Sequence, residues 1–341
     1  MAPQLQLSVV DQSPVRAGGT AADALQETIA LAVATEAMGY QRYWVAEHHN
    51  LPNFASTSPE VLIGQIAART RTIRVGSGGV MLPHYSAFKV AENFRLLESL
   101  YPGRIDLGLG RAPGSDQLTA IALAYPGRPR DAAQYPQQVV DLIGFLSASL
   151  PPDHPFANVH PGPSDGTMPE VWLLGSQSES AYMAATFGLP FSYAQFFGIG
   201  AHQGPAIVAN YRRHFKPSAF LSEPKVNVAL HVLCAETEEK ARRLAASRNL
   251  AKLKTALNQR GGVPTVEEAL SYPYTREERA YIEEFSQSYV DGDPQQVRAK
   301  LETISEMYQT TDISIVTICY SFADRVRSYE LVAESCGLKA P

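Results

Sequence analysis

Cysteine is scarce in this sequence, and its three copies stand far apart. Cys234, Cys319 and Cys336 form no C-x-x-C pair within the 341 residues. We therefore predict neither a cysteine-based zinc site nor a disulfide framework. Cys234 and Cys319 lie in apolar runs, which is typical of buried thiols.

Basic clusters and long apolar runs are also missing. The net charge of −5 argues against nucleic acid or an anionic membrane as the main partner. No apolar run approaches the length of a membrane span, and the first residues lack the basic and apolar regions of a signal peptide. We expect no nucleic-acid partner, no membrane association and a cytoplasmic location.

The sequence instead alternates between strand-like and helix-like periodicity. Eight strand-like segments are each followed by a helical pattern, which predicts a parallel α/β sheet with right-handed crossovers. Eight units favour closure into a (β/α)₈ TIM barrel, a single domain over residues 1–341. The expected strands are 5–10, 43–46, 73–81, 105–109, 171–174, 191–194, 226–234 and 313–319.

Two features qualify this pattern. A doubly wound sheet is the structural competitor, but its G-x-G-x-x-G fingerprint does not follow the first strand, where the chain reads D-Q-S-P-V-R-A-G-G. Residues 255–290 break the repeat with a polar and aromatic segment, which we interpret as an insertion between strands seven and eight. It is a candidate lid over the barrel mouth, or else a surface excursion without function.

Arg111 ends the run I-D-L-G-L-G-R at a strand terminus, where barrel enzymes place ligand-binding groups. Gly108 and Gly110 suggest close approach of a ligand to the backbone. The segment G-S-Q-S-E-S follows the fifth strand, and Ser176 with Glu179 fits a capping box. A helix N-terminus next to an arginine is also suited to a phosphate.

Two other strand ends carry polar or flexible residues. Glu47 and His49 should point to one side of the chain and His48 to the other, an awkward arrangement for a single metal ion, and we predict no metal site. One of these histidines is a candidate general acid–base, and the other a structural residue. The run G-S-G-G at residues 76–79 fits a flat ligand against the backbone, a strained peptide or a packing bulge.

On these motifs the chain resembles the bacterial luciferase-like flavin-dependent monooxygenases. The resemblance rests on W-V-A-E-H-H-N, I-R-V-G-S-G-G-V-M-L-P, A-E-N-F-R-L-L-E-S-L-Y-P-G-R-I-D-L-G-L-G-R-A-P-G and W-L-L-G-S-Q-S-E-S-A, and it spans almost the whole chain. It implies a barrel that binds reduced FMN (FMNH₂), supplied by a separate flavin reductase. With O₂, that flavin would oxidise a small apolar organic substrate in a homodimeric enzyme. An F420-dependent hydride-transfer enzyme and a non-catalytic flavin-binding barrel remain as alternatives.

The resemblance also implies roles for individual residues. His48 matches the family's catalytic histidine near the flavin ring, and Gly78–Gly79 matches a non-proline cis peptide beneath that ring. The positions that match contacts to the phosphate and ribityl chain are Arg111, Ser176, Gln177 and Ser180.

Overall fold

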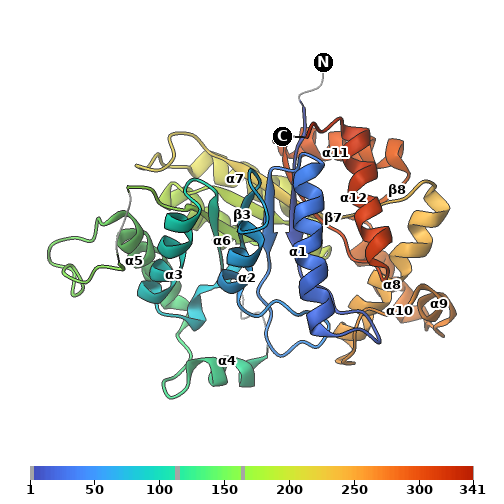
Figure 1. The fold of residues 1–341 in the computed structure, drawn as a ribbon, viewed down its shortest axis with the longest axis horizontal. Coiled ribbons are helices and arrows are strands. Elements are labelled where there is room, and N and C mark those ends of the chain that lie inside the picture. Colours follow the sequence, from blue (N-terminus) through green and yellow to red (C-terminus); the bar gives the residue numbers. More distant parts are fainter. Residues whose placement is uncertain (1–3, 112–115, 163–165, 341) are drawn as a thin grey trace.

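The computed structural model describes residues 4–111, 116–162 and 166–340, and its strands form a closed parallel barrel surrounded by helices (Figure 1). Strands β1 to β6 pair in chain order, β6 pairs with β7, and β9 lies between β7 and β1. The predicted (β/α)₈ barrel is thereby confirmed. The described strands are β1 (Gln6–Asp11), β2 (Arg42–Val45), β3 (Arg74–Met81), β4 (Ile105–Gly110), β5 (Glu170–Gly175), β6 (Phe191–Ala194), β7 (Val226–Cys234), β8 (Val290–Gly292) and β9 (Asp312–Val316).

Helices cover the outside of the barrel, and most of them carry one strand back to the start of the next. The described α-helices are α1 (Ala21–Ala37), α2 (Pro59–Ala67), α3 (Ala87–Leu100), α4 (Gln117–Ala124), α5 (Tyr135–Ser147), α6 (Ser178–Phe187), α7 (Gly204–His214), α8 (Glu238–Ala256), α9 (Val266–Ser271), α10 (Arg276–Ser286), α11 (Pro294–Tyr308) and α12 (Phe322–Cys336). Short 3₁₀ helices add η1 (Leu82–His84), η2 (Ala132–Gln134), η3 (Gln195–Phe197) and η4 (Ala201–Gln203).

Local sequence signals set the ends of several helices. At the start of α1, the Thr20 hydroxyl accepts from the backbone N–H of Asp23 at 3.1 Å, and the Asp23 carboxylate accepts from that of Thr20 at 2.9 Å. This reciprocal pair satisfies two otherwise unpaired donors. After α1 the chain turns at Gly39, whose φ of 89° lies in the left-handed region that favours glycine.

The insertion between β7 and the last barrel strand is present and more structured than the sequence indicated. It contains α9 and α10 and ends in β8, which pairs with the C-terminal part of β7. Its Val263 bonds to the loop after β1, donating to the Val15 carbonyl at 2.7 Å and accepting from the Ala17 N–H at 2.8 Å. The insertion is therefore anchored at β7 and at the loop after β1, on either side of β9.

Helix α4 was not predicted, because the sequence around it reads as a proline- and glycine-rich loop. None of its residues is buried, and Leu118 and Ile121 are 75% and 45% exposed. In Figure 1, α4 projects below the barrel at the same end as α9 and α10. Without a packed face, α4 leaves no helical burial pattern in the sequence.

Side chains that point into the barrel follow the period of two expected for strands. Arg42 and Trp44 of β2 and Glu170 and Trp172 of β5 point inward, so a charged layer lies below an aromatic one. The two indole rings meet edge to face with centroids 5.3 Å apart. They pack in a small core cluster inside the barrel, separate from the larger cluster between strands and helices.

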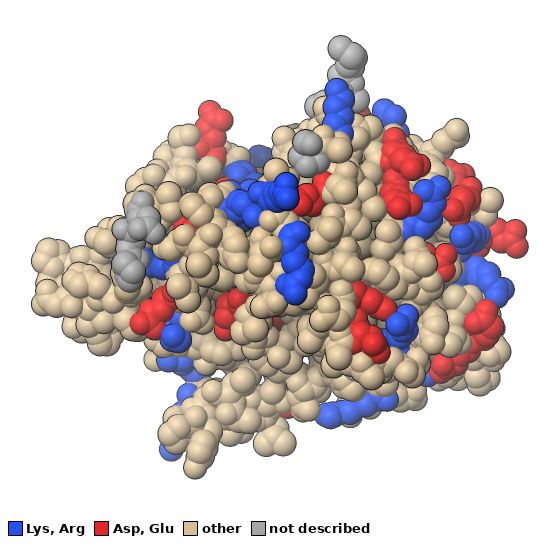
Figure 2. Space-filling view, in the orientation of Figure 1, with Lys and Arg blue, Asp and Glu red and all other residues tan. Residues whose placement is uncertain are grey.

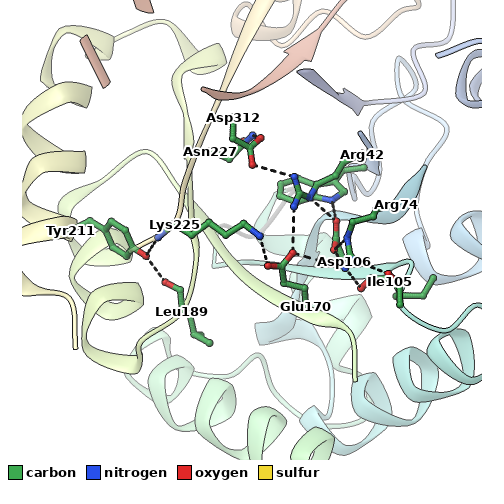
Figure 3. Close-up of polar contacts among 12 residues, drawn as sticks. Arg42, Arg74, Ile105, Asp106, Glu170, Leu189, Tyr211, Lys225, Asn227 and Asp312 are labelled. Carbon is green, nitrogen blue, oxygen red and sulfur yellow. Dashed lines mark hydrogen bonds and ion pairs between the residues drawn. The ribbon is translucent and has the colours of Figure 1, made fainter. Parts of the chain in front are cut away.

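The charged layer closes the N-terminal end of the barrel (Figure 3). Asp106 is fully buried and accepts from the Trp44 indole N–H at 2.9 Å and the Arg74 Nε–H at 2.8 Å. Arg42 bridges strands by bonding Asp312 at 3.2 Å. Three cations therefore face three carboxylates: Arg42, Arg74 and Lys225 with Asp106, Glu170 and Asp312. Because these charges balance, the layer stabilises the barrel floor and has no excess charge for a ligand.

The outer surface mixes charges of both signs. Acidic and basic side chains lie interspersed on the face shown in Figure 2, and both gather over the C-terminal helices at the right. Among the described residues, no helix combines the length and apolar character needed to cross a membrane.

Candidate active site at the barrel mouth

The C-terminal ends of all barrel strands meet at one end, because the strands are parallel. Strands β4 and β5 are direct neighbours, with Leu109 paired to Leu173. Arg111 follows the last residue of β4, and Ser176 follows the last residue of β5. The structure therefore brings these two predicted residues to the same edge of the mouth, although neither a hydrogen bond nor an ion pair joins them.

Helix α6 begins one residue later than a capping box of Ser176 and Glu179 would require. Its N-cap is Gln177, which makes no side-chain cap bond, so the predicted capping box of Ser176 and Glu179 is wrong. Ser180 occupies the third helical position instead and packs against the strand end, where a Cβ on Gly175 would lie 2.6 Å from its Oγ. The first turn of α6 thus lacks a side-chain acceptor for its backbone N–H groups, which suits an anion.

Arg111 is half-buried at the start of the loop after β4. Its guanidinium lies within electrostatic reach of Tyr135 in the first turn of α5: burial raises the pKa of Tyr135, and the positive charge opposes part of that rise. Among the described residues, no carboxylate forms an ion pair with Arg111. A partly buried guanidinium of this kind is suited to binding an external phosphate.

The peptide bond between Gly78 and Gly79 is cis, as the resemblance implied. The register with β4 shifts between Ser77 and Val80, so this strand end is also a bulge. A Cβ on Gly79 would lie 2.5 Å from Leu174 Cδ1, and one on Gly108 would lie 2.2 Å from the Ser77 carbonyl oxygen. Packing between strands therefore accounts for these two glycines without a ligand.

The three consecutive polar residues after β2 separate as alternation predicted. Glu47 and His49 point away from the mouth cavity: His49 Nε2 and Glu47 Oε1 lie 2.6 Å apart, and the Tyr85 hydroxyl donates to Glu47 at 2.9 Å. The backbone N–H of Met81 also donates to Glu47, at 3.0 Å. This group fixes the β2 end to the β3 end. Among the described residues, no cluster of three or more His, Cys, Asp or Glu side chains is arranged to hold a metal.

His48 points the other way, into a cavity at the mouth. Its ring stacks on Phe54 with centroids 4.5 Å apart, and its backbone N–H donates to the Ser56 carbonyl at 3.0 Å. Its Nδ1 atom is buried and has no partner among the described residues. Burial, with a smaller effect from neighbouring His49, lowers the pKa of His48 to about 4. The imidazole is therefore neutral near pH 7.

The cavity that His48 lines has a volume of about 310 Å³. Phe54 and Leu51 form one wall, and Phe196 and Phe197, next to β6, form part of another. The insertion contributes Val263 and Tyr281, which confirms that it lies over the barrel mouth. Such a small cavity, which combines apolar walls with polar side chains, is typical of a small-molecule site.

Sequence reasoning missed the wall formed by β7 and α8. His231, Arg248 and Lys252 all line the cavity. The inward register of β7 offered a signal for His231, since it interrupts the otherwise apolar half of V-N-V-A-L-H-V-L-C. Arg248 and Lys252 had no such signal, because α8 carries charges on most of its turns.

The depressed pKa of His48 gives a testable dependence of stability on pH. In an unfolded chain histidine titrates near 6.5, so between about pH 6.5 and 4 the unfolded state binds a proton at this position that the folded state does not. The contribution of neutral His48 to stability is present above this range and lost as the pH falls through it. We expect His48→Gln to reduce the loss of stability between pH 7 and 5 by about 1–2 kcal/mol, measured by urea unfolding. An identical loss in both proteins would contradict the assigned burial of His48.

A model of the luciferase-like monooxygenase family matches residues 5–311. The chain belongs to this family. It is 47% identical to YwcH of Bacillus subtilis over 97% of this chain and 99% of that protein. It is 37% identical to the N-acetyl-S-alkylcysteine monooxygenase of the same organism over 97% of this chain and 98% of that one.

Solved structures agree with the fold. The crystal structure of apo-MsnO8 superposes with a TM-score of 0.91 at 36% identity, covering 98% of this chain and 99% of that one. An FMN complex of the oxygenating constituent of 3,6-diketocamphane monooxygenase from Pseudomonas putida has a TM-score of 0.71 at 17% identity, with 99% of both chains covered. At that identity the likeness shows the fold alone.

Proposed function

We propose that this protein is an FMN-dependent monooxygenase that uses reduced FMN and O₂ to oxidise a small, largely apolar organic molecule. The family membership supports monooxygenase chemistry. The observation that supports the cofactor assignment is the pairing of β4 with β5, because Arg111 follows β4 and the uncapped start of α6 follows β5.

The donors at this edge fit a phosphate monoester. Arg111 provides a guanidinium without a carboxylate partner among the described residues, and α6 provides a helix N-terminus with no side-chain cap. We assign Arg111, Ser176, Gln177 and Ser180 to the phosphate and ribityl chain. The buried, unpartnered Nδ1 of His48 fits the polar edge of a flavin ring, and Gly78–Gly79 would lie beneath that ring.

Reduced FMN, when bound, supplies the electrons that activate O₂. The residues of this chain hold the cofactor, exclude water and move a proton. Neutral His48 is the proposed proton carrier, because its buried Nδ1 has no partner among the described residues and its ring lines the cavity. The insertion and Phe54 cover the cavity, which limits the entry of water to the reacting groups.

We further propose a homodimer in the cytoplasm that receives reduced FMN from a separate flavin reductase. Apolar side chains exposed on the outer faces of neighbouring helices support a dimer: Val61 of α2 is 67% exposed, and Leu96 and Leu100 of α3 are 63% and 61% exposed. Such a patch is typical of a protein–protein contact. The relative named for N-acetyl-S-alkylcysteine suggests a substrate that joins an apolar alkyl group to a polar part.

Replacing Arg111 tests the cofactor site. We expect Arg111→Ala to weaken the binding of reduced FMN by about 1.5–3 kcal/mol, because the substitution removes a charge-assisted hydrogen bond to the phosphate. Reduced riboflavin, which lacks the phosphate, should bind both proteins equally in anaerobic fluorescence titrations. Arg213→Ala, on the exposed face of α7, is the control for loss of one positive charge. If Arg111→Ala leaves the affinity for FMN unchanged, or lowers the affinity for riboflavin by the same amount, Arg111 does not bind the phosphate.

Oxygen consumption tests the reaction itself. With reductase-supplied reduced FMN, we expect O₂ uptake to rise when an organic substrate is added, beyond the uptake due to peroxide release. No substrate-dependent uptake with a range of apolar compounds would favour a non-catalytic flavin-binding barrel. Tighter binding of reduced F420 than of reduced FMN would overturn the FMN assignment.

A further inference from the structure

The mouth cavity has an unbalanced charge. Its lining includes two cationic residues, Arg248 and Lys252, and no aspartate or glutamate. The rest of the lining is mostly apolar or uncharged, with the neutral imidazoles of His48 and His231 among it. A cavity with cations and no acid attracts a ligand that carries negative charge.

Arg248 does not supply that excess charge. Its two terminal nitrogens donate to the Asp291 carboxylate of β8 at 2.9 and 2.7 Å, a bidentate pair that neutralises the guanidinium. Arg248 also lies over the Tyr289 ring, 4.5 Å from its centroid. It therefore holds β8 and Tyr289 against α8.

Lys252 has no such partner. Its Nζ donates to the Phe197 carbonyl and the Tyr289 hydroxyl, each at 2.6 Å, and both acceptors are uncharged. The ammonium group also lies over two aromatic rings, 4.5 Å from the centroid of Phe285 and 5.3 Å from that of Tyr289. No carboxylate of the described chain forms an ion pair with Lys252. Two hydrogen bonds and two aromatic rings position the group, and its positive charge has no anionic partner in the described part of the chain.

The position of Lys252 separates it from the proposed phosphate site. Helix α8 follows β7, and in the ring of eight barrel strands β7 stands opposite β3. Gly78–Gly79 is at the end of β3, and Arg111 follows β4. A cation on the β7 side of the mouth therefore faces the flavin ring from across the cavity, where a substrate would enter.

We infer that Lys252 binds the carboxylate of an amphiphilic substrate whose apolar part fills the cavity beside His48. This inference rests on the proposed function, because it assigns the substrate class for the same site. The phenylalanines of the lining accept the apolar part, and the positive charge of Lys252, which no carboxylate of the described residues neutralises, selects an acidic end. Burial, with a smaller effect from Arg248, lowers the pKa of Lys252 to about 8, so the ammonium form predominates at pH 7 and a bound carboxylate would stabilise it further.

Binding of octanoate and its neutral match octanamide to the flavin-free protein tests this inference by titration calorimetry at pH 7. We expect octanoate to bind about tenfold or more tightly than octanamide. Lys252→Met should weaken the affinity for octanoate about 10- to 100-fold and leave the affinity for octanamide nearly unchanged. Lys252→Arg should keep most of the preference for octanoate over octanamide. Lys254→Met is the matched control, because Lys254 is on the same helix but pairs with Glu268 outside the cavity.

Three outcomes would overturn the inference. The first is an absence of preference for octanoate over octanamide in the unsubstituted protein. The second is an equal loss of affinity for octanoate and octanamide in Lys252→Met, which would make Lys252 a packing residue. The third is a loss of FMN but not riboflavin affinity in Lys252→Met, which would assign the ammonium to the flavin phosphate. If the unsubstituted protein binds no FMN, the proposed function fails, and the octanoate titrations still decide the role of Lys252.

Discussion

Replacing His48 with alanine is expected to slow substrate oxidation about 10²- to 10⁴-fold, the range for losing a positioned acid–base group. The affinity for reduced FMN should fall much less. The expectation follows from the geometry: His48 lines the cavity, stacks on Phe54 and keeps Nδ1 without a partner among the described residues. Single-turnover oxidation and anaerobic flavin titration measure the two quantities separately.

His48→Gln separates the proton-transfer role from packing. Glutamine retains a hydrogen-bonding side chain but cannot carry a proton near neutral pH, so it should restore FMN affinity and leave oxidation slow. Equal losses of rate and affinity in His48→Ala would make His48 a binding residue. Full activity in His48→Gln would show that no proton passes through this position.

Removing the Asp106 carboxylate is expected to cost about 3–5 kcal/mol of unfolding free energy, the range for breaking a buried ion pair from one side. Asp106 is fully buried and accepts from Arg74 and Trp44 while lying 3.3 Å from Arg42. Asp106→Ala would leave both guanidinium groups with fewer partners at the barrel floor (Figure 3). Guanidinium chloride unfolding at pH 7 measures the change.

An exposed ion pair provides the comparison. Glu92→Ala breaks a contact with Lys89 at 3.1 Å on the surface of α3, and we expect a change of about 0–1 kcal/mol. If Asp106→Ala is as mild as Glu92→Ala, the charged layer does not hold the barrel floor together. Since this layer is remote from the mouth, Asp106→Asn should alter stability without altering the ratio of FMN to riboflavin affinity.

Most of the fold could be predicted from periodicity. The barrel strands pack on the helices outside and on one another inside, so each one carries an apolar run that the sequence displays. Some elements lacked such a signal, among them β8 and α4. Strand β8 has only three residues, and α4 buries none of its side chains. Elements that make little contact with the core impose little pattern on the chain.

The site was predictable where it depends on strand order and alternation. Alternation after β2 placed His48 on one side and Glu47 with His49 on the other, and strand order brought Arg111 and Ser176 to neighbouring strand ends. The capping box failed because Gln177, and not Ser176, is the N-cap of α6, so the helix begins one residue later than the motif requires. Lys252 was missed because its environment is created by Phe197 and Tyr289, residues distant in sequence.

A crystal structure of the protein with FMN tests the central claim most directly. The account predicts that the phosphate contacts the Arg111 guanidinium and the first turn of α6, with the flavin ring between Gly78–Gly79 and His48. A phosphate bound on the β7 side at Lys252, or at the charged floor beside Arg74 and Lys225, would contradict it.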